Sequence, residues 1–270
     1  MAFGFDGLET TKTNGGLNIL KIIASDYDGT FHRHHGIEQK DRDAVKKWRE
    51  SGNLFGVVTG RPTEMLEIIV KEKLELDFVI TYNGVDVYDL SGEPTLVKRL
   101  SGKSDRFYEL SPLILRKSGD WAEFITPDGN YYVTYNDETV HMRDHHVKRE
   151  VLKNINEFIQ IYALYKTEDE ALEVAQQLNE GFSEAVSPLV NGSWLNVAPS
   201  GVTKASGVWE YAKLKSIAKE YIFTIGDSYN DLDMIQKFKG YTVENGAEAI
   251  KKAALGICKG VWELIENIGG

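Results

Sequence analysis

Acidic side chains follow two of the short apolar runs in this sequence. Asp26 and Asp28 stand at the end of the first run, and Asp227 and Asp231 follow the other. If the two runs are neighbouring strands, these carboxylates meet at one edge of a sheet. Such a cluster repels itself unless a hard divalent cation binds in it, and oxygen ligands favour Mg²⁺. Asp-Gly is also a common turn sequence, so one acidic pair alone is a weak indication.

Four short apolar runs end abruptly in polar or glycine-containing clusters. They show no alternation of apolar and polar residues, which is typical of strands buried on both faces of a parallel sheet. Stretches with helical periodicity stand between or after them, and this alternation predicts a doubly wound, Rossmann-like α/β core. Ligands of such folds bind beyond the carboxyl ends of the strands, where the polar clusters fall. The strands are expected at 19–25, 54–58, 78–81 and 221–225, and the helices at 38–51, 63–73, 248–254 and 261–268.

The middle of the chain has a different pattern, with aromatic residues alternating along short segments. This pattern favours an antiparallel sheet with one covered face, accompanied by helices. We therefore expect an inserted α+β domain at 86–196, a core formed by 19–85 and 197–270, and a polar N-terminal leader at 1–18. Within the insert, strands are expected at 121–126, 131–135 and 161–166, and helices at 145–158 and 169–178.

Four motifs in order resemble those of the haloacid dehalogenase-like (HAD) phosphatases. The first is DYDGT at 26–30, the second TGR at 59–61, the third Lys204, and the fourth GDSYND at 226–231. Four ordered motifs, each beside an expected strand or helix, are a specific signal. The long insert between the second and third motifs resembles the type IIB cap of the Cof-type subfamily. Segments 82–84 and 197–204 are also similar to those that flank this cap.

The resemblance implies a catalytic role for three side chains. Asp26 would attack phosphorus and form an aspartyl phosphate, which splits one hard displacement into two easier ones. Asp28 would protonate the leaving oxygen and then activate water. Lys204 would supply a cation for Asp26 and for the phosphoryl group.

The resemblance also implies a metal site and a phosphate site. Mg²⁺ would be bound by the Asp26 carboxylate, the Asp28 carbonyl and Asp227, with Asp231 supporting the site. Phosphoryl oxygens would be held by Thr59, the Gly60 amide and Lys204, and Asn230 would contact the substrate side. Arg61 fits a phosphate clamp and a solvent-exposed helix start equally well.

Composition excludes several classes of function. The formal charge of −10 leaves no broad basic face for nucleic acid. The single cysteine, Cys258, excludes an intramolecular disulfide framework, and no apolar run is long enough to span a membrane. The N-terminus does not resemble a signal peptide. We expect a cytoplasmic enzyme, monomeric or homodimeric, that acts on a small phosphorylated metabolite.

Two other functions fit the same motifs. Relatives with this cap type include phosphomutases, which return the phosphoryl group from the aspartate to the substrate. A non-catalytic phosphosugar sensor would keep the fold and lose the chemistry. Histidines form two groups, 32–35 and 141–146, which are more often exposed loop residues than metal ligands.

Overall fold

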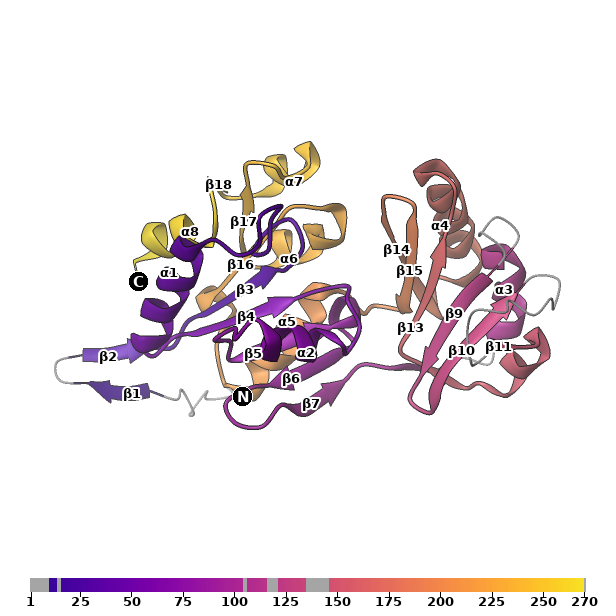
Figure 1. Cartoon of the computed structure of the whole chain (residues 1–270), viewed down its shortest axis with the longest axis horizontal. Helices are drawn as coiled ribbons and strands as arrows, with labels where there is room; N and C mark the ends of the chain where they lie inside the picture. Colours follow the sequence, from indigo (N-terminus) through magenta and orange to yellow (C-terminus); the bar gives the residue numbers. More distant parts are fainter. Residues whose placement is uncertain (1–9, 14–15, 104–105, 116–120, 135–145, 270) are drawn as a thin grey trace, which may run out of the picture. The chain divides into compact units, whose positions relative to one another are not determined.

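The computed structural model describes residues 10–13, 16–103, 106–115, 121–134 and 146–269 (Figure 1). The chain divides into two compact units. One combines Met1–Lys98 with Lys204–Gly270, and the other is Arg99–Thr203. The first unit contains all four motifs, so it is the unit that positions the candidate site.

The first unit is built on an eight-stranded sheet in which β3 is central. β3 pairs in parallel with β16 on one side and with β4 on the other. The chain continues outward from β4 in one direction and from β16 in the other, so the strand order reverses beside β3, where doubly wound folds bind their ligands. The strands in spatial order are β18 (Ile257–Cys258), β17 (Lys239–Val243), β16 (Ile222–Gly226), β3 (Ile22–Asp26), β4 (Leu54–Val58), β5 (Phe78–Thr81), β6 (Asp86–Asp89) and β7 (Thr95–Arg99).

Helices cover both faces of this sheet, as the unbroken apolar strands predict. Successive residues of β3 point to opposite faces: Ile23 packs in one hydrophobic cluster, and Ile22 and Ala24 pack in another. The first cluster includes residues of α1 (Gln39–Glu50), α2 (Met65–Lys71) and α8 (Val261–Ile268), and the second those of α5 (Lys204–Leu214) and α6 (Leu232–Lys237). Helix α7 (Glu248–Ala253) packs against β17.

The second unit is an α+β domain with a six-stranded sheet, which confirms the expected fold class. All pairs of its sheet are antiparallel except the one between β10 and β11. Helices α3 (Phe107–Leu115) and α4 (Glu168–Phe182) share one hydrophobic cluster with the sheet. The strands in spatial order are β11 (His146–Val147), β10 (Gly129–Thr134), β9 (Trp121–Thr126), β13 (Gln160–Leu164), β15 (Trp194–Pro199) and β14 (Val186–Asn191), and a small separate sheet pairs β8 (Gly102–Lys103) with β12 (Glu157–Phe158).

The division between the units differs from the boundaries expected at 85/86 and 196/197. Strands β6 and β7 extend the core sheet, so the first unit continues to Lys98, and β15 belongs to the sheet of the second unit. Strands near the chain boundary between the units have the same local pattern, and only their pairing partners distinguish them. Strands β1 (Thr10–Thr13) and β2 (Gly16–Ile19) pair antiparallel, and all of their residues but Ile19 lie in the expected leader.

The helix expected at 145–158 is wrong. The described part of this segment contains β11, a 3₁₀ turn at Arg149–Asn154 and β12. Asparagine competes with helical hydrogen bonding, and the turn ends at Asn154. In the described parts of the chain, no helix is both long and apolar enough to cross a bilayer.

Candidate active site

Three carboxylates meet at the carboxyl ends of β3 and β16. Asp26 is the last residue of β3, Asp227 directly follows β16, and Asp231 ends the short 3₁₀ turn Tyr229–Asp231. One oxygen from each lies within 4.8 Å of the others. Within the described ranges, this is the one group of three or more acidic, histidine or cysteine side chains close enough to hold a metal ion. Parallel pairing of the two strands brings the motifs together, as expected.

Asp26 is buried, with 4% of its surface exposed. Its Oδ1 accepts a hydrogen bond from Lys204 Nζ at 2.5 Å, and its buried Oδ2 has no hydrogen-bond partner among the described residues. Burial raises the pKa of Asp26 well above its usual range, and the charge of Lys204 opposes this rise. A buried carboxylate oxygen without a hydrogen-bond donor is costly, which favours a bound cation or a proton beside this atom.

Lys204 is the first residue of α5, and its ammonium neutralises part of the charge of the carboxylate cluster. Its ammonium is buried and also donates to Asp231 Oδ1 at 2.6 Å. Burial disfavours the charged amine, but the charges of Asp231 and Asp26 outweigh it and raise the pKa of Lys204 above its usual value. The cluster therefore contains three carboxyl groups and one ammonium, which binds two of them directly.

Asp231 is committed to holding the loop that follows β16. Its Oδ2 accepts hydrogen bonds from the backbone amides of Asp227 and Ser228, both at 3.0 Å, and its Oδ1 is bound by Lys204. Both carboxylate oxygens thus have protein partners. These contacts favour a supporting role for Asp231, and that role stays a prediction.

Residues of the first motif position the Asp227 carboxylate. Its Oδ1 accepts a hydrogen bond from Thr30 Oγ1 at 2.9 Å. Gly29 has φ +87°, and a Cβ built on it would lie 2.5 Å from Asp227 Oδ2, so a larger residue there would displace the carboxylate. Burial, with repulsion from Asp231, raises the pKa of Asp227. A divalent cation would relieve this repulsion.

Asp28 lies outside the cluster, which corrects the expectation that its carboxylate approaches the other three. It forms a two-point ion pair with Arg61, from Nε to Oδ2 at 2.7 Å and from Nη2 to Oδ1 at 2.6 Å. Half of the Asp28 side chain is exposed. The hydrogen bond to Asp28 raises the pKa of Arg61. Arg61 therefore binds a carboxylate of the first motif in this structure, and a phosphate-clamping role for it stays a prediction.

The second motif forms a turn at the end of β4. Thr59 is buried, its amide donates to Ile80 O at 2.9 Å, and its Oγ1 accepts the amide of Arg61 at 3.1 Å. Gly60 packs closely on Asn83: a Cβ built on it would lie 3.1 Å from Asn83 Oδ1. The chain therefore turns here with its backbone against a neighbouring polar side chain.

Asn230 lies in the fourth motif and faces Asn83, for which the four motifs predict no role. Its Nδ2 donates to Asn83 Oδ1 at 3.3 Å, and its Oδ1 accepts from Ser228 Oγ at 2.7 Å. Asn83 follows β5 in an Asn-Gly pair, and this turn sequence at a strand end was the signal for it. Thr30 was likewise missed, although it stands within the first motif.

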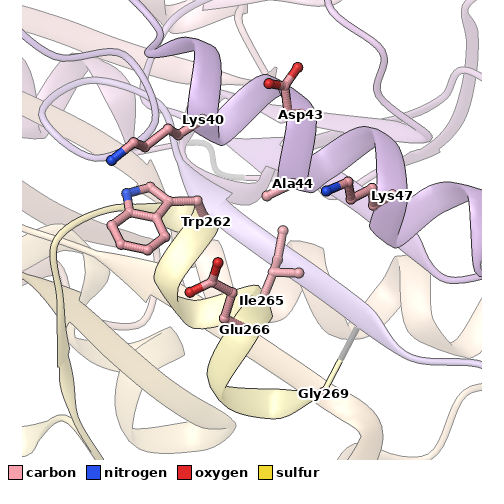
Figure 2. Close-up of a pocket in the computed structure, with 8 residues that line it drawn as sticks. All are labelled: Lys40, Asp43, Ala44, Lys47, Trp262, Ile265, Glu266 and Gly269. Carbon is pink, nitrogen blue, oxygen red and sulfur yellow. The ribbon is translucent and has the colours of Figure 1, made fainter.

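A separate hollow lies between α1 and α8, away from the motif residues. It has a volume of about 580 Å³, and its lining includes Lys40, Lys47, Trp262 and Glu266 (Figure 2). None of the residues implied for catalysis, metal or phosphate lines it. His34 and His35 are exposed and His32 stacks on Tyr27, while the residues 141–145 of the second histidine group lie outside the described residues.

Solved structures resemble this chain over nearly its whole length. The HAD subclass IIB sugar phosphatase BT4131 has a TM-score of 0.74 and 20% identity, covering 92% of this chain and 99% of its own. A haloacid dehalogenase-like hydrolase from B. subtilis has a TM-score of 0.75 and 19% identity, covering 92% and 100%. These similarities show a shared fold.

Sequence relatives agree with the fold. Two 5-amino-6-(5-phospho-D-ribitylamino)uracil phosphatases of Bacillus subtilis (strain 168) are similar to it. YitU is 21% identical over 86% of this chain and 90% of its own length, and YcsE is 24% identical over 87% and 88%. Residues 23–261 match the haloacid dehalogenase-like hydrolases, which spans all four motifs. The chain belongs to the haloacid dehalogenase-like hydrolase family.

Proposed function

We propose that this chain is a Mg²⁺-dependent phosphatase that hydrolyses a small phosphomonoester, in the first place a sugar phosphate, through an aspartyl phosphate on Asp26. The observation that carries the proposal is the state of the Asp26 carboxylate. Lys204 binds one of its oxygens, and the other is buried without a partner at the edge where ligands of this fold bind. A carboxylate oriented in this way is suited to nucleophilic attack.

The donor set fits Mg²⁺. The ligands would be the Asp26 carboxylate, the Asp28 carbonyl and Asp227, all hard oxygen donors, with Asp231 holding the loop and Lys204. The excess of carboxylates over ammonium groups supports a cation at this position. When bound, Mg²⁺ would offset the repulsion between the carboxylate and the phosphoryl oxygens.

In the first step, an Asp26 oxygen forms a bond to phosphorus as the bond from phosphorus to the leaving oxygen breaks. Asp28 gives its proton to that oxygen, and the alcohol departs. In the second step, Asp28 takes a proton from water, the water oxygen attacks phosphorus, and Asp26 leaves as a carboxylate with inorganic phosphate. Thr59, the Gly60 amide and Lys204 hold the phosphoryl oxygens, and Asn230 contacts the substrate side. General acid–base catalysis of this kind contributes about 10²–10⁴-fold.

The second unit, Arg99–Thr203, is proposed to be the cap that limits the substrate to small molecules. Relatives of similar length support this size class: two are named for a phosphorylated ribitylaminouracil, and the structural neighbour BT4131 is a sugar phosphatase. The substrates in these names are phosphate esters of small polyols or sugars, and this supports the same class of substrate here.

Chemical trapping tests the proposal. The enzyme is mixed with p-nitrophenyl phosphate and Mg²⁺, quenched rapidly in acid, and digested for mass spectrometry. One phosphoryl group is expected on the peptide that contains Asp26, and Asp26→Asn should abolish turnover while thermal unfolding shows the fold intact. Release of inorganic phosphate, rather than a phosphate isomer, distinguishes hydrolysis from a mutase. Near-wild-type turnover by Asp26→Asn would contradict the assignment.

A further inference from the structure

The turn after β5 has an unusual backbone. Three consecutive residues have positive φ: Tyr82 at 52°, Asn83 at 55° and Gly84 at 114°. Side chains rarely adopt this region, although asparagine does so more readily than most. All three residues are buried. Two adjacent non-glycine residues in this conformation persist only where the surroundings hold them, and such turns concentrate at functional sites.

Two neighbouring segments hold the turn. The amide of Tyr82 donates to Arg61 O at 3.0 Å, and that of Asn83 donates to Thr59 O at 2.9 Å. On the other side, α5 packs directly on the turn: a Cβ built on Gly207 would lie 2.9 Å from Gly84 Cα. The turn is therefore fixed between the second motif and the helix that begins with the third.

The conformation places the Asn83 side chain between two parts of the candidate phosphate site. Its exposed fraction is 0%, and its Oδ1 accepts the hydrogen bond from Asn230 Nδ2 at 3.3 Å. The same carboxamide lies against Gly60, whose added Cβ would be 3.1 Å from Oδ1 and 3.2 Å from Nδ2. One buried side chain thus contacts both the second and the fourth motif.

We infer that Asn83 is a positioning residue for phosphoryl binding, which rests on the proposed function. Its carboxamide sets the orientation of Asn230 and supports the Gly60 turn, so that these two groups bind one phosphoryl group together. Asn83 acts through them and is not itself one of the three clustered carboxylates. Its loss should therefore weaken phosphate binding without changing the affinity for Mg²⁺.

The variant Asn83→Gly separates the side chain from the backbone. Glycine adopts positive φ readily, so the turn is retained while the carboxamide is lost. We expect the inhibition constant of inorganic phosphate to rise and kcat/KM for p-nitrophenyl phosphate to fall, each by about 10- to 100-fold, because small misplacements of binding groups have effects of this size. The dissociation constant of Mg²⁺ should stay near wild type, and thermal unfolding should remain cooperative although at a lower temperature.

A matched control is Ser216→Gly. Ser216 also has positive φ, 53°, but it is exposed and lies after the C-terminal end of α5. This variant also replaces a non-glycine residue of positive φ by glycine, but it does so away from the site. Wild-type phosphate inhibition is expected, which assigns any loss in Asn83→Gly to the missing carboxamide.

The deciding measurement is the coupling between Asn83 and Asn230. In a double-mutant cycle with Asn230→Ala, Asn83→Gly should weaken phosphate binding much less than it does in the wild type. If Asn83→Gly does not fold, Asn83→Ala, which removes the carboxamide without adding a charge, takes its place in the cycle. The inference would be overturned if the two substitutions reduced phosphate affinity by independent factors that simply multiply in the double variant. Wild-type phosphate binding by the Asn83 variant would also overturn it. Direct calorimetric titration of inorganic phosphate needs no turnover, and trapping at Asp26 tests the proposed function separately.

Discussion

Arg61 binds Asp28 through two parallel hydrogen bonds of 2.7 and 2.6 Å, which fixes the plane of the carboxylate. The guanidinium also lies 5.1 Å from the centre of the ring of Tyr27, the residue between the two aspartates of the first motif. The nucleophile candidate Asp26 is thus buried in the cluster, while Asp28 is held outside it by a residue of the second motif. Two carboxylates two residues apart have different environments, and the proposed reaction requires them to have different roles.

Replacing Arg61 by lysine should affect the proton-transfer role of Asp28 selectively. Lysine keeps the charge but cannot form the two-point contact. We expect kcat/KM to fall about tenfold for an alkyl phosphate, as part of the general acid–base contribution, and clearly less for p-nitrophenyl phosphate, whose leaving group needs little protonation. Steady-state kinetics with both substrates measures the ratio. An equal loss for both substrates would contradict this role.

Arg49→Lys is the matched control for that variant. Arg49 binds Asp77 in the same two-point way, with both hydrogen bonds at 2.9 Å, and Asp77 also accepts the amide of Phe55. This pair joins α1 to the segment before β5 and contains no motif residue. Its loss should lower the melting temperature and leave the substrate ratio unchanged.

Removal of Mg²⁺ should abolish activity. EDTA is expected to stop turnover and added Mg²⁺ to restore it, because the clustered carboxylates cannot approach a phosphoryl group without charge compensation. Asp227→Asn should raise the dissociation constant of Mg²⁺ by at least about tenfold, measured by calorimetric titration. Asp233→Asn is the control, since Asp233 is an exposed acid of α6 outside the cluster. Full activity in EDTA would remove the metal from the mechanism.

Substrate size should separate a capped enzyme from an open one. If Arg99–Thr203 encloses the substrate, phosphorylated sugars should be cleaved far more efficiently than a folded phosphoprotein or a polynucleotide. The measurement is kcat/KM for phosphate release across a panel of small phosphate esters and one phosphoprotein. Efficient dephosphorylation of the folded phosphoprotein would overturn the proposed cap.

Most of the site could be predicted because its residues follow strand ends within short motifs. Asp26, Asp227 and Asp231 converge because β3 and β16 are neighbours, which is the condition on which the sequence prediction depended. The separation of Asp28 could not be predicted, since Arg61 reaches it from another strand end and motif spacing does not define rotamers. At Asn83 the sequence indicates only an Asn-Gly turn, because the hydrogen bonds of Tyr82 and Asn83 to Arg61 O and Thr59 O, which hold its backbone, are tertiary contacts.

The fold was least predictable where pairing decides the structure. Strand β6 could belong to either unit by its local sequence, and only its antiparallel register with β5 assigns it to the core. In the second unit, a periodic apolar pattern at 145–158 indicated a helix, but its described residues pair in two short strands on either side of a 3₁₀ turn. Tertiary contacts override local propensity in such short segments.

Acid should remove the stabilising contribution of one charged carboxylate of the first unit, Asp89. This carboxylate, at the end of β6, forms an ion pair with Lys215 at 2.7 Å and accepts hydrogen bonds from Tyr211 at 3.2 Å and from the Ser91 amide at 2.9 Å. Burial opposes its charge, but the hydrogen bonds from Lys215 and Ser91 outweigh it and lower the pKa of Asp89 to about 2.

Because the folded pKa is below the unfolded value of about 3.9, the charged form stabilises the fold above that value, and this contribution is lost as the pH falls through about 2. Asp89→Asn should therefore lower the free energy of unfolding by about 1–2 kcal/mol at pH 7, after allowance for solvent screening. The difference from wild type should shrink below about pH 4. Urea unfolding across this range measures it. Glu210→Gln, which removes an exposed α5 pair with Lys213, should change stability by less than about 0.5 kcal/mol. A cost of Asp89→Asn that stays constant or grows on acidification would show that the carboxylate charge does not stabilise the junction of β6 and α5.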